Sequence, residues 1–101
     1  MIGILLQLFG VLKLDKSYYV YIIRCADGTL YTGSTDDVQR RLEVHRSGKG
    51  AKYTRGRGPL ELVYTEVCGS HSDALKRELE VKKLTRQEKE LLIQNSSKTE
   101  A

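Results

Sequence analysis

Side chains able to handle a phosphate group follow one another in a regular order along this chain. Tyr21 and Tyr31 lie ten residues apart, and Arg41 and His45 follow, four positions apart. Glu78 adds a carboxylate further along. Phenols, a permanent positive charge, an imidazole and a carboxylate are together the groups that phosphodiester cleavage requires.

Arg41 and His45 are spaced to share one face of a helix, because residues four apart are neighbours on a helical surface. A guanidinium stays charged at every relevant pH and can bind a phosphate through two hydrogen bonds. The alternative is an ordinary surface arginine and a histidine at the boundary of an apolar stripe. The helix by itself does not decide between the two interpretations.

Glu78 falls on the apolar face of a predicted helix, together with Ala74 and Val81. An ionised carboxylate there is costly unless a cation or hydrogen-bond donors meet it. A divalent metal ion or Arg41 would serve. The alternative is an exposed ion pair with Lys82, which would stabilise the helix by only a few tenths of a kcal/mol.

The tyrosines are weak bases unless their surroundings change their pKa. With an ordinary pKa near 10, roughly one phenol in a thousand is ionised at pH 7. A phenolate becomes accessible only if Arg41 or a metal ion lies close to the ring oxygen. A chemical role for Tyr21 or Tyr31 therefore predicts that Arg41 lies near them in space. The alternative is that tyrosine simply suits β-strands.

A basic loop follows, with no acidic residue between positions 46 and 58. Its candidate nucleic-acid contacts are Arg46, Lys49, Lys52, Tyr53, Arg55 and Arg57. Such a loop suits a clamp on the phosphate backbone, although charge runs often form only a solvated surface. No element that reads base edges is apparent, so we expect weak sequence preference. The net charge of +4 is a mild basic bias that fits a nucleic-acid partner or plain solubility.

The composition indicates one domain. The chain has 101 residues, of which 40% are apolar and 30% charged, enough for one core. Cys25 and Cys68 are far apart and form no CxxC motif, which excludes a zinc site built from cysteines. We expect two thiols at strand ends and a reducing, cytoplasmic environment.

The predicted organisation has three parts: an apolar extension over residues 1–16, a domain over 17–94 that carries the candidate catalytic residues, and a polar tail over 95–101. The extension is too short to span a bilayer, which takes about 20 residues, and its Lys13 follows the apolar run where a signal peptide has its basic residues first. Three interpretations remain for it: an added element covering the core, a weak membrane-surface helix, or residues added by an upstream start codon.

Hydrophobic periodicity predicts the elements that position these side chains. Strands are expected over 18–24, 30–33 and 60–67, with the first covered on both faces and Gly33 ending the second. Helices are expected over 36–47, 70–84 and 85–94, the last with Thr85 and Glu88 as a capping box. The order ββαβαα predicts an α+β domain with a small three-stranded antiparallel sheet flanked by helices.

The order of these features resembles the GIY-YIG nuclease family over about residues 18–93. Tyr19-Val20-Tyr21 corresponds to the first motif of the family, and Tyr31-Thr32-Gly33 corresponds to the second. Arg41 and His45 match the arginine and histidine of the following helix, and Glu78 matches the glutamate of the later helix. The passage from Ser47 to Arg55 is similar to the small stand-alone bacterial branch of this family.

The resemblance implies a metal-dependent endonuclease acting on DNA, in repair or on branched or damaged DNA. Glu78 would hold one Mg²⁺ or Mn²⁺ ion, and Arg41 would stabilise the charge that develops on the phosphate. Tyr21 or Tyr31, helped by His45, would take a proton from the attacking water. Tyr21 is the favoured base, with Tyr31 positioning the water or phosphate. A covalent phosphotyrosine route is less favoured.

Two positions depart from the family pattern. Tyr19 replaces the glycine of the first motif, a change that the small branch shares. The asparagine that some members carry on a later helix is missing from Arg86-Gln87-Glu88-Lys89-Glu90, and Asn95 comes too late. Catalysis is then expected to be weak or restricted to particular DNA structures.

The rival hypothesis is a nucleic-acid-binding module with little activity, acting beside a partner protein or in a larger repair complex. We expect a monomer without stable membrane association.

Overall fold

The computed structural model describes residues 17–100, without the side chains of residues 52 and 97–100. The predicted apolar extension, residues 1–16, lies outside the described residues. The elements are β1 (Tyr18–Arg24), β2 (Leu30–Thr35), α2 (Val38–Arg46), the 3₁₀ turn η1 (Lys52–Thr54), β3 (Glu61–Cys68), α3 (His71–Lys82) and α4 (Arg86–Glu100). None of the helices within residues 17–100 is long and apolar enough to cross a membrane.

The three strands form one antiparallel sheet in the order β2-β1-β3. Central β1 has residues of both faces fully buried, since Val20, Ile22 and Ile23 all have 0% exposure. Opposite β1, strand β2 pairs Gly33 with Tyr21 and Thr32 with Ile22. The predicted α+β class, the small antiparallel sheet and the ββαβαα order are confirmed.

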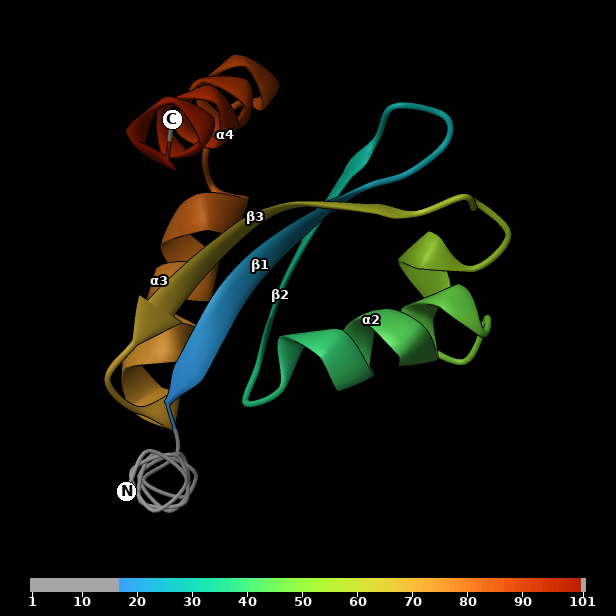
Figure 1. Ribbon diagram of the computed structural model, residues 1–101, viewed down its shortest axis with the longest axis horizontal. Helices are drawn as coiled ribbons and strands as arrows, with labels where there is room; N and C mark the ends of the chain where they lie inside the picture. Colours follow the sequence, from blue (N-terminus) through green and yellow to red (C-terminus); the bar gives the residue numbers. More distant parts are fainter. Residues whose placement is uncertain (1–16, 101) are drawn as a thin grey trace, which may run out of the picture.

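Alternate residues of β1 supply two separate cores. Val20 and Ile22 pack with Val81 of α3 and Ile93 of α4. On the other face, Tyr21 and its neighbours Ile23, Cys25, Leu42 and Leu60 form the second core. Helices α3 and α4 therefore cover one face of the sheet and α2 covers the other, with β2 as an edge strand between them (Figure 1).

The predicted end of the second strand at Gly33 is wrong, because β2 continues to Thr35. Glycine has no side chain but can keep extended backbone, and here Gly33 stays paired with Tyr21. Helix α2 begins at Val38, two residues after the expected start. Its cap is Asp37, whose side chain accepts a hydrogen bond from the backbone N–H of Arg40 at 3.0 Å.

The last two helices have the predicted starts. Ser70 caps α3, and Thr85 and Glu88 form the predicted capping box, with reciprocal hydrogen bonds of 3.1 and 2.8 Å. The predicted end of the last helix at Gln94 is wrong, since α4 runs to Glu100. The sequence after Gln94 is polar but contains neither glycine nor proline, so no residue there breaks the helix.

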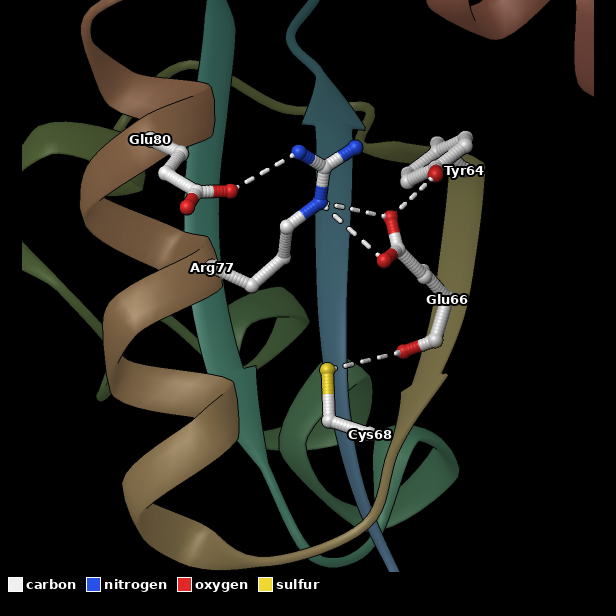
Figure 2. Close-up of polar contacts among 5 residues, drawn as sticks. All are labelled: Tyr64, Glu66, Cys68, Arg77 and Glu80. Atoms are coloured by element: carbon white, nitrogen blue, oxygen red, sulfur yellow. Dashed lines mark hydrogen bonds and ion pairs between the residues drawn. The ribbon is translucent and has the colours of Figure 1, made fainter.

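A polar network attaches α3 to the outer strand β3 (Figure 2). The Nε atom of Arg77 donates to both carboxylate oxygens of Glu66 at 3.0 Å, and its Nη1 donates to Glu80 at 3.0 Å. The Tyr64 hydroxyl donates to Glu66 at 2.6 Å. Burial, followed by this contact with Glu66, raises the pKa of Tyr64 to about 12. Arg77 thus fixes the rotation of α3 at the residue immediately before Glu78.

A second ion pair fixes α4 against the end of β1. Arg24 donates to both carboxylate oxygens of Glu90 at 2.8 and 2.9 Å, and Arg86 adds a contact at 3.2 Å. The hydrogen bond from Arg24 is the main reason that the pKa of Glu90 falls to about 2. Both cysteines lie at strand ends, as expected, and both are free; Cys25 is buried.

Candidate active site

A chain of hydrogen bonds connects the first motif to the basic loop. The Tyr21 hydroxyl lies 2.9 Å from Nε2 of His45, and Nδ1 of His45 lies 3.0 Å from Oγ1 of Thr54. Thr54 donates its own proton to the carbonyl of Ala51 at 3.0 Å. Two contacts meet at Nδ1: Thr54 can accept a hydrogen bond from it at 3.0 Å, while the backbone N–H of Ala51 points to it at 3.4 Å. We assign the proton to Nδ1 because the contact with Thr54 is the shorter one, and this leaves Nε2 free to accept the proton of Tyr21. His45 is not a boundary residue, since only 1% of it is exposed.

Two glycines allow these rings to sit where they do. A Cβ atom on Gly33 would lie 2.6 Å from the Tyr21 hydroxyl oxygen and 2.7 Å from its Cζ atom. A Cβ atom on Gly50 would collide with Nδ1 of His45. Both positions therefore accept only glycine without a shift of the ring beside them. In Tyr31-Thr32-Gly33, the glycine is therefore needed because it leaves room for the Tyr21 ring.

Tyr21 is a neutral phenol in this environment. Burial raises the pKa of Tyr21 to about 12, and contact with the Arg41 guanidinium opposes the rise without cancelling it. Arg41 therefore lies beside Tyr21, as a chemical role for the tyrosine requires. The sequence suggested that this cation would favour the phenolate, but desolvation outweighs it.

His45 is neutral at pH 7. Burial and, second, the positive charge of Arg41 lower the pKa of His45 below its ordinary value of 6.5. A neutral imidazole with an unprotonated Nε2 is a competent proton acceptor at physiological pH. Tyr21 and His45 together form a donor–acceptor pair in which the proton already points from the phenol to the imidazole.

Aromatic rings continue from this pair toward the basic loop. Tyr31 lies 5.2 Å from the His45 ring, 6.3 Å from the Tyr21 ring and 5.8 Å from the Tyr53 ring, measured between centroids. The guanidinium of Arg57 lies 4.9 Å from the centroid of Tyr53. Tyr31 is therefore in contact with both the proton-transfer pair and the loop.

Glu78 lies on the other face of the sheet, with both carboxylate oxygens engaged. Ser34 of β2 donates to Oε1 at 2.6 Å, and the Lys82 ammonium lies 2.7 Å from Oε2. The Glu78 side chain is only 16% exposed. Glu78 is therefore half-buried, and the ion pair with Lys82, which the sequence offered as the alternative, forms as well. The partners that offset its charge are Ser34 and Lys82.

The two halves of the site meet across the edge strand β2. Neighbouring residues of a strand point to opposite faces, so Gly33 faces Tyr21 and Ser34 faces Glu78. The charge of Glu78 contributes to the raised pKa of Tyr21. Tyr31 contributes, after Glu78, to the raised pKa of Lys82. The structure brings Tyr21, Tyr31, Arg41 and His45 together on one face of the sheet, with Arg41 and His45 supplied from α2. Glu78 of α3 lies across β2 on the other face and interacts with Tyr21 through its charge.

The donor set suits a metal ion shared with a substrate. No cluster of three or more histidine, cysteine or acidic side chains that could hold a metal ion occurs in the described part of the chain, so an ion bound to Glu78 would take further ligands from substrate and water. Mg²⁺ is often held by one or two carboxylates, substrate phosphates and water. The half-buried Glu78 carboxylate, held by Ser34 and Lys82, fits that role and does not fit a site built from protein ligands alone.

The predicted nucleic-acid contacts differ in what surrounds them. Arg57 pairs with Asp27 at 2.6 Å, which ties the loop to the turn between β1 and β2. Arg46 lies 3.9 Å from Glu43. Lys49 and Arg55 are exposed, as is 44% of Tyr53, while the side chain of Lys52 lies outside the described residues. The exposed members remain predicted contacts, whereas Arg57 also has a structural role.

Three polar residues at the site were not recognised as site residues in the sequence. These residues are Ser34, Thr54 and Lys82, and of the three only Lys82 is singled out by the sequence, as a possible ion-pair partner of Glu78. Each is positioned by a contact between segments far apart in the chain. Only the spacing of Lys82, one helical turn after Glu78, was a usable local signal.

Comparison with known proteins places residues 17–91 in the GIY-YIG catalytic domain. The chain is 57% identical to a UPF0213 protein of Natronomonas pharaonis over 76 residues, which is 75% of this chain and 89% of that protein. A UPF0213 protein of Oceanobacillus iheyensis is 49% identical over 81 residues, which is 80% of this chain and 94% of the relative.

Solved structures show the same similarity. The solution NMR structure of a UPF0213 protein from Bacillus halodurans matches with a TM-score of 0.51 and 55% identity, covering 77% of this chain and 83% of that one. An NMR structure of a protein from E. faecalis matches with a TM-score of 0.53 and 44% identity, covering 76% and 83%.

The contact between Gly33 and Tyr21 predicts the cost of adding one methyl group. We expect Gly33→Ala to lower the free energy of unfolding by about 1–3 kcal/mol, because the Tyr21 ring must move away from a well-packed position. Gly69→Ala is the matched control, since the nearest atom to its added Cβ is a carboxylate oxygen of exposed Asp73 at 3.4 Å. Urea unfolding would measure both, and equal stability of the two variants would contradict this account.

Proposed function

Because this chain belongs to the GIY-YIG family, we propose that it is a nuclease, and specifically a metal-dependent endonuclease that hydrolyses phosphodiester bonds in DNA. The observation that carries the proposal is the convergence across β2. The Tyr21–His45 pair, Arg41 and Glu78 come from three segments and both faces of the sheet, yet they interact electrostatically. Packing alone does not require this combination of groups.

The hydrogen bonds support a proton relay that needs no free phenolate. As the attacking water gives its proton to the Tyr21 oxygen, the Tyr21 proton passes to Nε2 of His45, 2.9 Å away. Thr54 holds the tautomer of His45 that makes this transfer feasible. The raised pKa of Tyr21 is therefore compatible with a role as the base, which we assign to Tyr21.

The remaining residues would bind and polarise the phosphate. Arg41 carries a permanent charge beside Tyr21 and would stabilise the charge developing on the phosphate oxygens. Tyr31 packs edge-on against His45 and would position the water or the phosphate. One Mg²⁺ or Mn²⁺ ion held by Glu78 would neutralise charge on the scissile phosphate and its leaving oxygen.

The loop that follows α2 would contact the DNA backbone through its exposed members, including Lys49, Tyr53 and Arg55. Contacts of this kind give weak sequence preference. A role in DNA repair, or in processing branched or damaged DNA, fits an enzyme that recognises structure more than sequence. The rival proposal is a DNA-binding module without activity. The presence of both Arg41 and Glu78 favours the enzyme, because binding to the DNA backbone needs neither of these half-buried side chains.

We predict that Arg41→Ala and Glu78→Gln each slow single-turnover DNA cleavage by at least roughly 100-fold. The fold and the DNA affinity should change little, as measured by circular dichroism melting and by equilibrium binding in the absence of metal. Substrates should include duplex, branched and single-stranded DNA with Mg²⁺ or Mn²⁺.

Arg40→Ala and Glu80→Gln are the matched controls. The Arg40 side chain is 66% exposed and pairs with Asp36 and Asp37 just before α2, while the Glu80 side chain is 65% exposed. Parental cleavage rates in Glu78→Gln would contradict the catalytic assignment. DNA binding without cleavage of any substrate by the parent protein would support the rival module.

The lowered pKa of His45 predicts the pH dependence of cleavage. A neutral His45 accepts the proton, so kcat/KM should fall as the pH drops through a value below 6.5 and His45 becomes charged. His45→Gln should lose this acid limb and react roughly 100-fold more slowly. The measurement is a pH profile of both proteins between pH 5 and 9. An identical acid limb in the two profiles would show that another group titrates.

A further inference from the structure

Lys82 is the residue of the site to which the relay and the phosphate contacts assign no role. It lies on α3 one turn after Glu78, with its ammonium 2.7 Å from Oε2 of that carboxylate. Ser34 occupies the other oxygen at 2.6 Å. In the protein alone, Glu78 therefore has a complete set of partners without a metal ion.

The environment distinguishes this pair from an ordinary surface ion pair. The Glu78 side chain is 16% exposed, so its charge needs a nearby cation. The Lys82 side chain is 48% exposed and has a flexible four-carbon stem. Glu78 is held by two elements, while Lys82 can leave. The mobile member of the pair is the lysine.

A divalent ion and the Lys82 ammonium would compete for the same carboxylate oxygen. Two cations within ~4 Å of each other repel by several kcal/mol in a partly buried site. An ion can bind Glu78 closely only if Lys82 moves away and finds another anion. Lys82 lies close enough to Tyr31 for the two side chains to interact electrostatically. The anion that would enter there is a DNA phosphate.

We propose that Lys82 makes metal binding depend on DNA: it occupies Glu78 in the free protein and transfers to a substrate phosphate when DNA and the metal ion enter together. This inference rests on the proposed nuclease function. Lys82 excludes the metal ion from Glu78 in the free protein and is a phosphate contact in the complex. DNA and the ion then raise each other's affinity by the same factor.

The experiment measures Mn²⁺ binding to the full chain without DNA, by isothermal titration calorimetry and by electron paramagnetic resonance of free Mn²⁺. Lys82→Met should bind Mn²⁺ at least ~10-fold more tightly than the parent, because the competing charge is gone. The charge-conserving Lys82→Arg should stay close to the parent. Lys83→Met is the matched control for the loss of one positive charge, since the adjacent Lys83 is exposed and makes no side-chain ion pair or hydrogen bond within the described residues.

The gain must depend on Glu78, so Glu78→Gln combined with Lys82→Met should lose it. Adding a short duplex oligonucleotide in the Arg41→Ala background should raise Mn²⁺ affinity strongly when Lys82 is present and weakly when Lys82→Met is added. Equal Mn²⁺ affinity of Lys82→Met and the parent without DNA would overturn the proposal, as would undetectable binding to a folded Lys82→Met.

The measurement without DNA does not involve cleavage. A failure of the nuclease proposal would appear as an inactive parent protein, whereas a failure of the Lys82 proposal would appear as unchanged metal affinity. If Lys82 only stabilises the helix, its loss would lower the melting temperature slightly and leave Mn²⁺ binding as it is in the parent.

Discussion

Glycine at position 33 is the constraint on which the rest of the site depends, because only a residue without a side chain leaves room for Tyr21. Strand β2 is the edge of the sheet, and α2 and α3 lie on opposite faces of it. A Cβ atom at Gly33 would press into the Tyr21 hydroxyl, so only glycine leaves the phenol at this edge. The next residue, Ser34, holds Glu78 on the other side. The groups of two faces thereby reach a common edge.

Desolvation then determines the chemistry available there. Desolvation keeps Tyr21 protonated and His45 neutral. The nearby positive charge of Arg41 lowers the pKa of both groups, so it opposes desolvation at Tyr21 and adds to it at His45. The result is a phenol that donates to an imidazole, which together can take a proton from water without a stable phenolate. On the opposite side, Arg77 fixes α3 against β3, so that Glu78 is held toward β2 and Lys82 beside it.

Much of the fold could be predicted because hydrophobic periodicity in this chain is local and regular. The run from Tyr18 to Arg24 matched β1 at both ends, and Thr85 with Glu88 marked the start of α4. The five catalytic candidates came from residue types and motif spacing. Contacts between distant segments, such as the one between Ser34 and Glu78, could not be predicted. Gly33 reads as a strand end in isolation, and only the pairing of β2 with β1 shows that the strand continues past it. The end of α4 was missed for a local reason, since polar residues alone do not end a helix.

The proposed mechanism requires that the Tyr21–His45 pair and Glu78 act on the same phosphate. A double-mutant cycle of cleavage tests this most directly. Single-turnover rates would be measured for Tyr21→Phe, Glu78→Gln and the double variant. Groups that act as a unit have strongly non-additive effects. The account predicts that the double variant is about as slow as the slower single variant. Two losses that multiply in full would contradict it, because they would mean that the residues act independently.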